Sequence, residues 1–173
     1  IIVRTLQNIL RSKARPLTVV VGNDADLIRK ALSQADLTDT HIVSCPTYAM
    51  GLSHSLKAGI ASLPSHVEAA IVCLADMPFV QPDDIDRLIS EFNPAKNHLI
   101  VVPVHQGRQG NPMVWGKEFF AHIMKLEGDK GARQILEKYA QSIIEVEIHH
   151  QGIFMDIDSP DDLSKARDFK FTS

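Results

Sequence analysis

A carboxylate that could take part in metal-assisted chemistry follows the most apolar run of this chain. Asp76 lies just beyond Ala69 to Leu74, which is too short for a typical helix and is β-branched at its centre. Such a run is typical of a strand buried on both faces in a parallel α/β sheet. Ligands of these sheets bind beyond the carboxyl ends of the strands, which is where Asp76 lies. The alternative is an Asp that only caps a turn, and its position alone does not decide between the two.

A second acidic segment, D-I-D-S-P, covers residues 156 to 160. Alternation along a short strand over 154–158 would place Asp156 and Asp158 on the same side. Ser159 or Asp158 could cap the next helix, with Pro160 in its first position, but capping does not explain both carboxylates. Asp76, Asp158 and Asp156 are therefore candidate ligands of Mg²⁺, with water and substrate phosphates filling the remaining positions.

The segment G-L-S-H-S, at residues 51 to 55, opens a predicted helix. Unpaired N–H groups at a helix N-terminus, together with Gly51, Ser53 and Ser55, would suit an anion or the polar edge of a nucleotide. Read alone, the same residues are more often just an ordinary helix cap, because a single Gly/Ser turn is a weak signal.

The segment G-R-Q-G-N-P, at residues 107 to 112, is too rich in Gly to form part of a core. It carries one cation, Arg108, and one amide, Asn111. A tight hairpin turn is the alternative interpretation of this segment.

Alternating strands and helices must position these residues. Apolar runs predict strands over 17–21, 41–45, 69–74, 99–104, 111–115, 142–148 and 154–158. Helical periodicity is found over 1–11, 83–92, 118–126 and 160–169. Three further helices are predicted. One begins near residue 24 with Leu27, Ile28, Ala31 and Leu32 on its buried face, one follows the segment at 51–55 and ends near residue 63, and one follows the loop at 128–133 and ends near residue 139. This order predicts one α/β domain over 1–173, with three layers and a mixed, mainly parallel sheet.

The composition excludes several classes of function. The chain has 173 residues and a net charge of -3, which argues against broad nucleic-acid binding. No apolar run approaches the length of a membrane span. Cys45 and Cys73 lie in apolar segments, so we expect buried thiols of a cytoplasmic protein rather than a disulfide.

Five motifs occur together in one order. They are G-L-S-H-S-L-K-A-G at 51–59, L-A-D-M-P at 74–78, G-R-Q-G-N-P-M-V-W at 107–115, G-D-K-G-A-R at 128–133 and D-I-D-S-P-D-D-L at 156–163. This set resembles the nucleotidyltransferases that make molybdenum-cofactor dinucleotides, and the loops at 107 and 128 resemble most closely the cytidylyltransferase branch. The resemblance implies a Rossmann-like, glycosyltransferase-A-like nucleotidyltransferase fold.

The resemblance also implies a reaction, in which CMP passes from CTP to the terminal phosphate of molybdopterin and pyrophosphate leaves. Asp76 and Asp158 would be the catalytic residues and would hold Mg²⁺ against the phosphates, while Gly51, Ser53, Ser55 and Asp76 would bind the nucleotide. The acceptor site would consist of Arg108, Asn111, Lys130 and Arg133. Alternatives are a guanylyltransferase using GTP, a sugar-phosphate nucleotidyltransferase, and a non-catalytic module that holds a cofactor for a molybdoenzyme or its chaperone.

One part of the family pattern does not occur within these residues. The family begins with a strand and a Gly-rich loop of the form L-A-A-G-x-S-x-R-M-G, followed by a Lys, and this loop binds the triphosphate. The first residues here resemble the helix that follows that loop. We therefore expect the first strand and its loop to precede Ile1; a protein without them would not bind nucleotide in this way.

Overall fold

The computed structural model describes residues 1–37, 39–129, 131–159, 161, 162 and 164. Its α-helices are α1 (Ile2–Arg11), α2 (Ala25–Gln34), α3 (Leu52–Ala61), α4 (Pro82–Glu91) and α5 (Phe120–Ile123). Its strands are β1 (Thr18–Val21), β2 (His41–Ser44), β3 (Ala69–Val72), β4 (Ile100–His105), β5 (Arg108–Gln109), β6 (Met113–Gly116) and β7 (Ile143–Glu147). Short 3₁₀ helices are η1 (Tyr48–Met50), η2 (Pro94–Lys96), η3 (Lys117–Phe119), η4 (Ala132–Lys138), η5 (Ala140–Ser142) and η6 (Gln151–Phe154).

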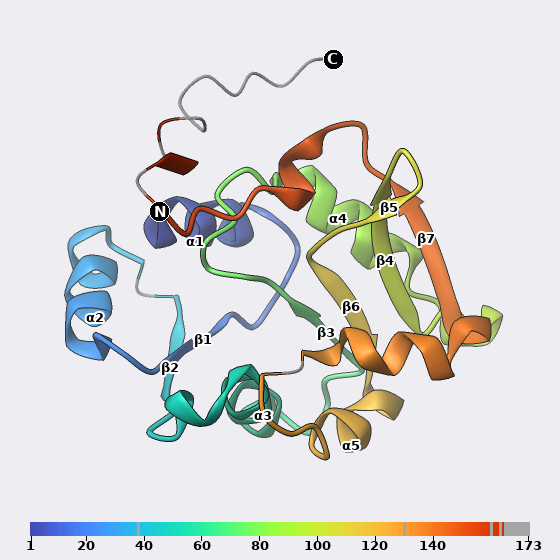
Figure 1. Ribbon diagram of the computed structural model, residues 1–173, viewed down its shortest axis with the longest axis horizontal. Helices are drawn as coiled ribbons and strands as arrows, with labels where there is room; N and C mark the ends of the chain where they lie inside the picture. The colour runs from blue at the N-terminus through green and yellow to red at the C-terminus, as the bar shows by residue number, and fades with distance from the viewer. Residues whose placement is uncertain (38, 130, 160, 163, 165–173) are drawn as a thin grey trace.

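The strands form two separate sheets flanked by helices (Figure 1). β1 and β2 pair in parallel. The larger sheet has the order β3-β6-β4-β5, and β7 pairs with β4. Pairing is parallel in β4–β7 and antiparallel in β3–β6, β4–β6 and β4–β5. The predicted α/β class with a mixed sheet is confirmed, but parallel pairs do not predominate among the described strands because β6 runs against both of its neighbours.

The larger sheet holds most of the core. Its central strand β4 is buried from Ile100 to Val104, and Trp115 of β6 is only 1% exposed. Helix α4 packs on this sheet with Ile85 and Leu88 fully buried. Pro82 in its first turn and the capping box between Gln81 and Asp84 fix where the helix begins.

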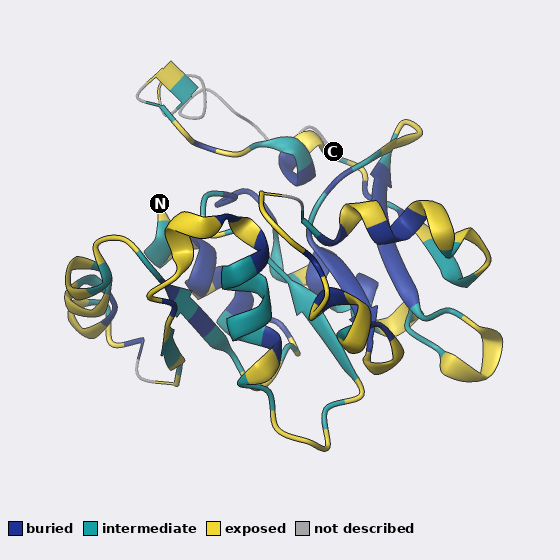
Figure 2. Cartoon of the chain, turned by 60° about the horizontal axis from the view of Figure 1, so that its bottom comes forward, coloured by how far each residue is buried: buried dark blue, intermediate teal, exposed yellow. Residues whose placement is uncertain are grey.

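A groove separates the two sheets. β3 has a strand partner only in β6 and β1 only in β2, so among the described residues each has one unpaired edge. The space between them is about 460 Å³ and is lined largely by apolar side chains of α1, β1, α3 and β3. All four residues of β3 are consequently only half-buried, as Figure 2 shows, and the prediction that this strand is buried on both faces is wrong.

Three other predicted elements differ from the structure. Leu27 is 66% exposed, because α2 covers only a two-stranded sheet and buries Leu32 alone. The predicted helix that ends near residue 139 is the 3₁₀ helix η4 rather than an α-helix. The residues 154–158 form no strand: η6 ends at Phe154 and the chain then continues as an extended link. The predicted helix over 160–169 lies mostly outside the described residues.

The loop at 107–112 begins as a hairpin. Gln106 and Gly107 both have positive φ, 52° and 78°, and connect β4 to β5 as the sequence alternative proposed. Within the described part of the chain, no helix combines the length and apolar character needed to span a membrane.

Candidate functional site

The three predicted acidic residues come together at the end of the groove. The residues from the start of β3 to Ala75 line the groove, and Asp76 follows them directly. The backbone N–H of Ile157 donates to the carbonyl oxygen of Asp76 at 3.0 Å. Ile157 is buried with Phe79, whereas Asp156 and Asp158 are exposed on either side of it. The predicted alternation therefore holds although the predicted strand does not form.

Asp76 is in an environment that disfavours its charge. Burial raises the pKa of this carboxyl above its usual value, and the charges of Asp158 and Asp156 raise it further, against a hydrogen bond from its own backbone N–H that lowers it. Its Oδ1 is buried and has no hydrogen-bond partner among the residues that the structure describes. A buried oxygen of this kind needs a partner, and a cation would satisfy it and relieve the repulsion among the three acids.

The residues present fit a divalent cation that is only partly held by protein. Asp76, Asp156 and Asp158 offer the hard oxygen ligands that Mg²⁺ and Mn²⁺ take. Among the residues that the structure describes, no three His, Cys, Asp or Glu side chains are already arranged to hold a metal ion. A cation here would thus take most of its ligands from water and from substrate.

Gly51 and Ser53 lie where two loops meet at the start of α3. Gly51 has φ +116°, and a Cβ there would lie 2.4 Å from the carbonyl carbon of Gly128. The N–H of Ser53 donates to the carbonyl oxygen of Gly128 at 3.2 Å, and the Ser53 hydroxyl is fully buried without a partner. Ser55 lies apart from them on the wall of the groove. Only the hydroxyl of Ser53, which has no partner among the described residues, therefore suggests a ligand.

The basic residues form a second cluster around the loop at 107–112. The guanidinium of Arg108 lies over the ring of Phe154, 4.5 Å from its centroid. Nη2 of Arg133 donates to the carbonyl oxygen of Gly110 at 3.1 Å, and the N–H of Asn111 donates to that of Ile153 at 3.0 Å. The structure thus brings Arg108, Asn111 and Arg133 together. Lys130, the remaining predicted acceptor residue, lies outside the described residues.

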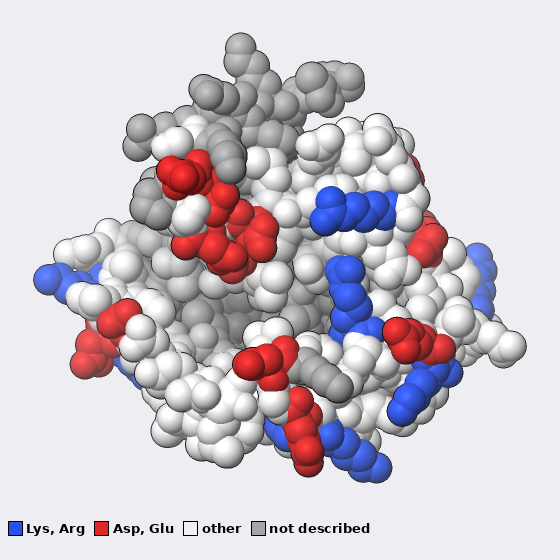
Figure 3. Space-filling view, viewed as in Figure 1, with Lys and Arg blue, Asp and Glu red and all other residues white. Residues whose placement is uncertain are grey.

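The acidic and basic side chains border one hollow in the surface. Figure 3 shows it at the centre of the face seen in Figure 1, with acidic groups above and below it and basic groups along its right side. An anionic substrate could therefore lie between a cation bound to the acids and the guanidinium groups.

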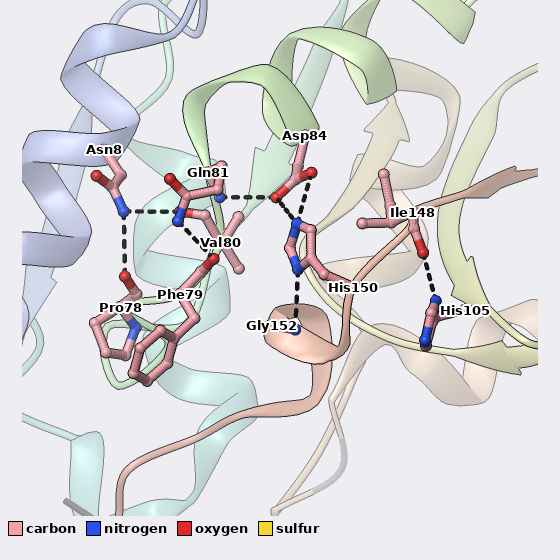
Figure 4. Close-up of polar contacts among 10 residues, drawn as sticks. All are labelled: Asn8, Pro78, Phe79, Val80, Gln81, Asp84, His105, Ile148, His150 and Gly152. Carbon is pink, nitrogen blue, oxygen red and sulfur yellow. Dashed lines mark hydrogen bonds and ion pairs between the residues drawn. The ribbon is translucent and has the colours of Figure 1, made fainter. Parts of the chain in front are cut away.

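The sequence reasoning missed the polar residues that hold this site from behind (Figure 4). Asn8 of α1 is 3% exposed and its amide donates to the carbonyl oxygens of Pro78 and Val80 at 3.2 and 2.8 Å. Thr5 donates to the carbonyl oxygen of Ala75 at 3.0 Å. The available signal was a hydroxyl and an amide on the apolar face of the first helix.

A mixed sheet flanked by helices, with acids beyond one strand and guanidinium groups around the loop at 107–112, is compatible with an enzyme of the nucleotidyl-transfer class. A family model described as MobA-like NTP transferase domain matches residues 1–143, and the chain belongs to that family. The chain is 26% identical to the molybdenum cofactor cytidylyltransferase of Escherichia coli K12 over 95% of its own length and 80% of that protein's.

Solved structures show the same fold. The crystal structure of Rv0371c from Mycobacterium tuberculosis is similar with a TM-score of 0.82 at 22% identity, covering 95% of this chain and 82% of that one. A second structure of that protein, in complex with manganese, has a TM-score of 0.77 at 23% identity and covers 95% and 84% of the two chains. A nucleotidyl transferase from Methanothermobacter has a TM-score of 0.80 at 18% identity, with 96% and 78% covered.

Proposed function

We propose that this nucleotidyltransferase transfers CMP from CTP to molybdopterin with the help of a divalent cation, Mg²⁺ in the cell. The observation that carries the proposal is Asp76, whose buried Oδ1 has no hydrogen-bond partner among the described residues and whose pKa is raised by burial and by Asp158 and Asp156. The similarity to a molybdenum cofactor cytidylyltransferase supports the choice of substrates.

In this reaction a terminal phosphate oxygen of molybdopterin forms a bond to the α-phosphorus of CTP, and the bond between that phosphorus and the oxygen bridging to the β-phosphate breaks. Pyrophosphate leaves with the electron pair. The cation would neutralise charge on the phosphates. Asp76, Asp156 and Asp158 would hold that cation, and Arg108 and Arg133 would attract the anionic acceptor. No side chain serves as a nucleophile, and burial raises the pKa of the Cys73 thiol to about 12, which keeps it protonated.

Ser53 is our candidate for contact with the nucleotide through its side-chain hydroxyl, because the N–H groups of Ser53 and His54 already donate to the carbonyl oxygens of Gly128 and Gly51. Its hydroxyl is buried without a partner at a helix N-terminus, where polar groups of a ligand are favoured. Ser55 lies on the groove wall and Gly51 is packed against Gly128, so we assign Gly51 the role of shaping this loop.

We also propose that a further strand of the polypeptide, encoded upstream of Ile1, occupies the groove and supplies the Gly-rich loop. The support is the groove itself: two unpaired strand edges, four residues long in β1 and in β3, face a space with apolar walls. A strand paired with both edges would join the two sheets into one.

The direct test of the proposed function is pyrophosphate release by the upstream-extended protein with Mg²⁺, molybdopterin and either CTP or GTP. We expect release that depends on both CTP and molybdopterin. Pyrophosphate release with a sugar phosphate in place of molybdopterin would instead support the sugar-phosphate nucleotidyltransferase. Tight nucleotide binding without any release would support the non-catalytic module.

A further inference from the structure

A histidine–carboxylate pair lies behind the acidic site and is largely shielded from solvent (Figure 4). Nε2 of His150 is 3.0 Å from Oδ2 and 3.1 Å from Oδ1 of Asp84, and the two side chains are 13% and 10% exposed. Oδ2 of Asp84 also accepts the backbone N–H of Gln81 at 2.8 Å. The carboxylate is thereby fixed to the first turn of α4 while it contacts the ring.

The hydrogen bonds of His150 define its tautomer. Nδ1 lies 3.0 Å from the backbone nitrogen of Gly152. A backbone N–H only donates, so Nδ1 accepts and the ring proton lies on Nε2, which donates to Asp84. One neutral imidazole therefore links the start of α4 to the first turn of η6 through both of its nitrogens.

The residues that follow His150 reach both clusters of the candidate site. A Cβ at Gly152 would lie 2.8 Å from the carbonyl oxygen of Phe79, in the loop after Asp76. Ile153 accepts the N–H of Asn111, and the ring of Phe154 lies under the guanidinium of Arg108. The same segment then runs to Ile157, whose N–H donates to Asp76. A displacement of η6 would thus move the acidic segment and the base of the Arg108 loop together.

We propose that Asp84 and His150 are a positioning pair that holds η6 in place. Through η6, the pair keeps Asp156 and Asp158 beside Asp76, and it keeps the Phe154 ring beneath Arg108. Neither residue is placed in contact with substrate. The consequence for metal and acceptor binding rests on the proposed function, whereas the positioning of the segment does not. Residues that orient metal ligands in this indirect way typically change metal affinity by about tenfold or more when they are replaced.

Two substitutions separate the two bonds of the ring. His150→Gln keeps a donor near the place of Nε2 but loses the acceptor for Gly152. His150→Asn keeps an acceptor near the place of Nδ1 but is too short to reach Asp84. His149→Gln is the matched control, because His149 is the exposed neighbour in sequence.

Amide hydrogen exchange tests the positioning without any ligand. We expect the amide of Ile157 to exchange about tenfold faster in both His150 variants, with amides of β4 and the His149→Gln protein unchanged. Unchanged protection of Ile157, or an equal increase at Ile157 and throughout β4, would overturn the proposal, because the pair would then have no local effect or only a global one.

Manganese affinity with CTP, followed by electron paramagnetic resonance in the upstream-extended protein, tests the consequence for the site. We expect about tenfold weaker binding in the His150 variants. Unchanged affinity in variants whose Ile157 amide exchanges faster would overturn the link to the metal site. If Ile157 responds as expected but the wild-type protein binds no manganese and releases no pyrophosphate, the proposed function fails and the positioning of the segment stands.

Discussion

Asp76 combines three properties that are seldom found together by chance: a place at the end of a strand, a buried oxygen without a partner, and two nearby acids. Structural carboxylates usually have their hydrogen bonds satisfied. An unsatisfied one that repels its neighbours costs stability, so its presence favours a role in binding a cation.

The substitution Asp76→Asn should therefore separate function from stability. We expect turnover with Mg²⁺ to fall by about 100-fold or more, measured as pyrophosphate release. Because burial raises the pKa of Asp76, the folded protein binds that proton more tightly than the unfolded chain does, and the free energy of unfolding decreases as pH rises through the raised pKa. The uncharged amide removes this loss, so the thermal midpoint of the metal-free variant should stay within a few degrees of wild type or rise.

The matched control is Asp83→Asn, which removes an exposed carboxylate from the first turn of α4. Its turnover should be that of wild type. Wild-type turnover in Asp76→Asn would show that Asp76 is not a metal ligand in the reaction.

Arg108 belongs to the acceptor side of the site. Its guanidinium lies over Phe154 on the loop that Arg133 also contacts. Arg108→Ala should raise the KM for molybdopterin by about tenfold with little change in that for CTP, since a contact to one substrate is lost. Arg87→Ala, an exposed change on α4, is the control for a simple loss of positive charge. A variant that weakens CTP alone would move Arg108 to the nucleotide side.

At the scale of elements, two loops distant in sequence depend on each other. Gly51 approaches Gly128 so closely that any side chain would meet the backbone. Gly51→Ala should lower the free energy of unfolding by about 2 kcal/mol or more, measured by urea denaturation. Gly107→Ala is the matched control, because its φ of +78° is similarly unfavourable but nothing lies within 4 Å of the added carbon. Equal losses would mean that the contact with Gly128 contributes nothing.

The groove between β1 and β3 leads to a prediction about nucleotide binding. The 173-residue chain should bind Mg-CTP weakly, because these residues include no loop of the form L-A-A-G-x-S-x-R-M-G to offer its N–H groups to the triphosphate. Calorimetry on this chain and on the protein extended upstream of Ile1 should show a much higher affinity for the longer one, together with a higher thermal midpoint as the groove is filled. Equal affinities would mean that the nucleotide does not use such a loop.

The elements show what local patterns can and cannot predict. Apolar runs located most of the strands, and the place of Asp76 after β3 followed from one of them. They could not reveal that β3 is half-buried, since its exposure depends on the groove beside the unpaired edge that it presents among the described residues. The alternation over 154–158 predicted a strand, but the N–H of Met155 donates back to Gly152 and that of Ile157 donates to Asp76, so no strand ladder forms there.

The candidate site, too, could be predicted only in part from local sequence patterns. Asp76, Asp156 and Asp158 were predicted from their positions, and the structure brings them together. The part played by Asn8 and His150 depends on contacts with residues 70 and 66 positions away, which no local pattern encodes. Their polar type within otherwise apolar surroundings was the only clue.

At the scale of the whole molecule, acidic and basic groups lie on different sides of one hollow in the surface (Figure 3). Membership in the MobA-like NTP transferase family gives the class of reaction, and the choice of base and acceptor is the part that we propose. These are properties of the assembled site, so they are best tested by the complete reaction rather than by binding of one substrate.

The most direct test is the initial rate of pyrophosphate release by the upstream-extended protein with Mg²⁺ and molybdopterin, with CTP and GTP compared at equal concentration. We predict a rate with CTP at least about 10-fold above that with GTP, and loss of the CTP rate in Asp76→Asn. Equal rates with the two nucleotides would contradict the cytidylyl assignment, and a CTP rate that survives in Asp76→Asn would contradict the metal site on which the account depends.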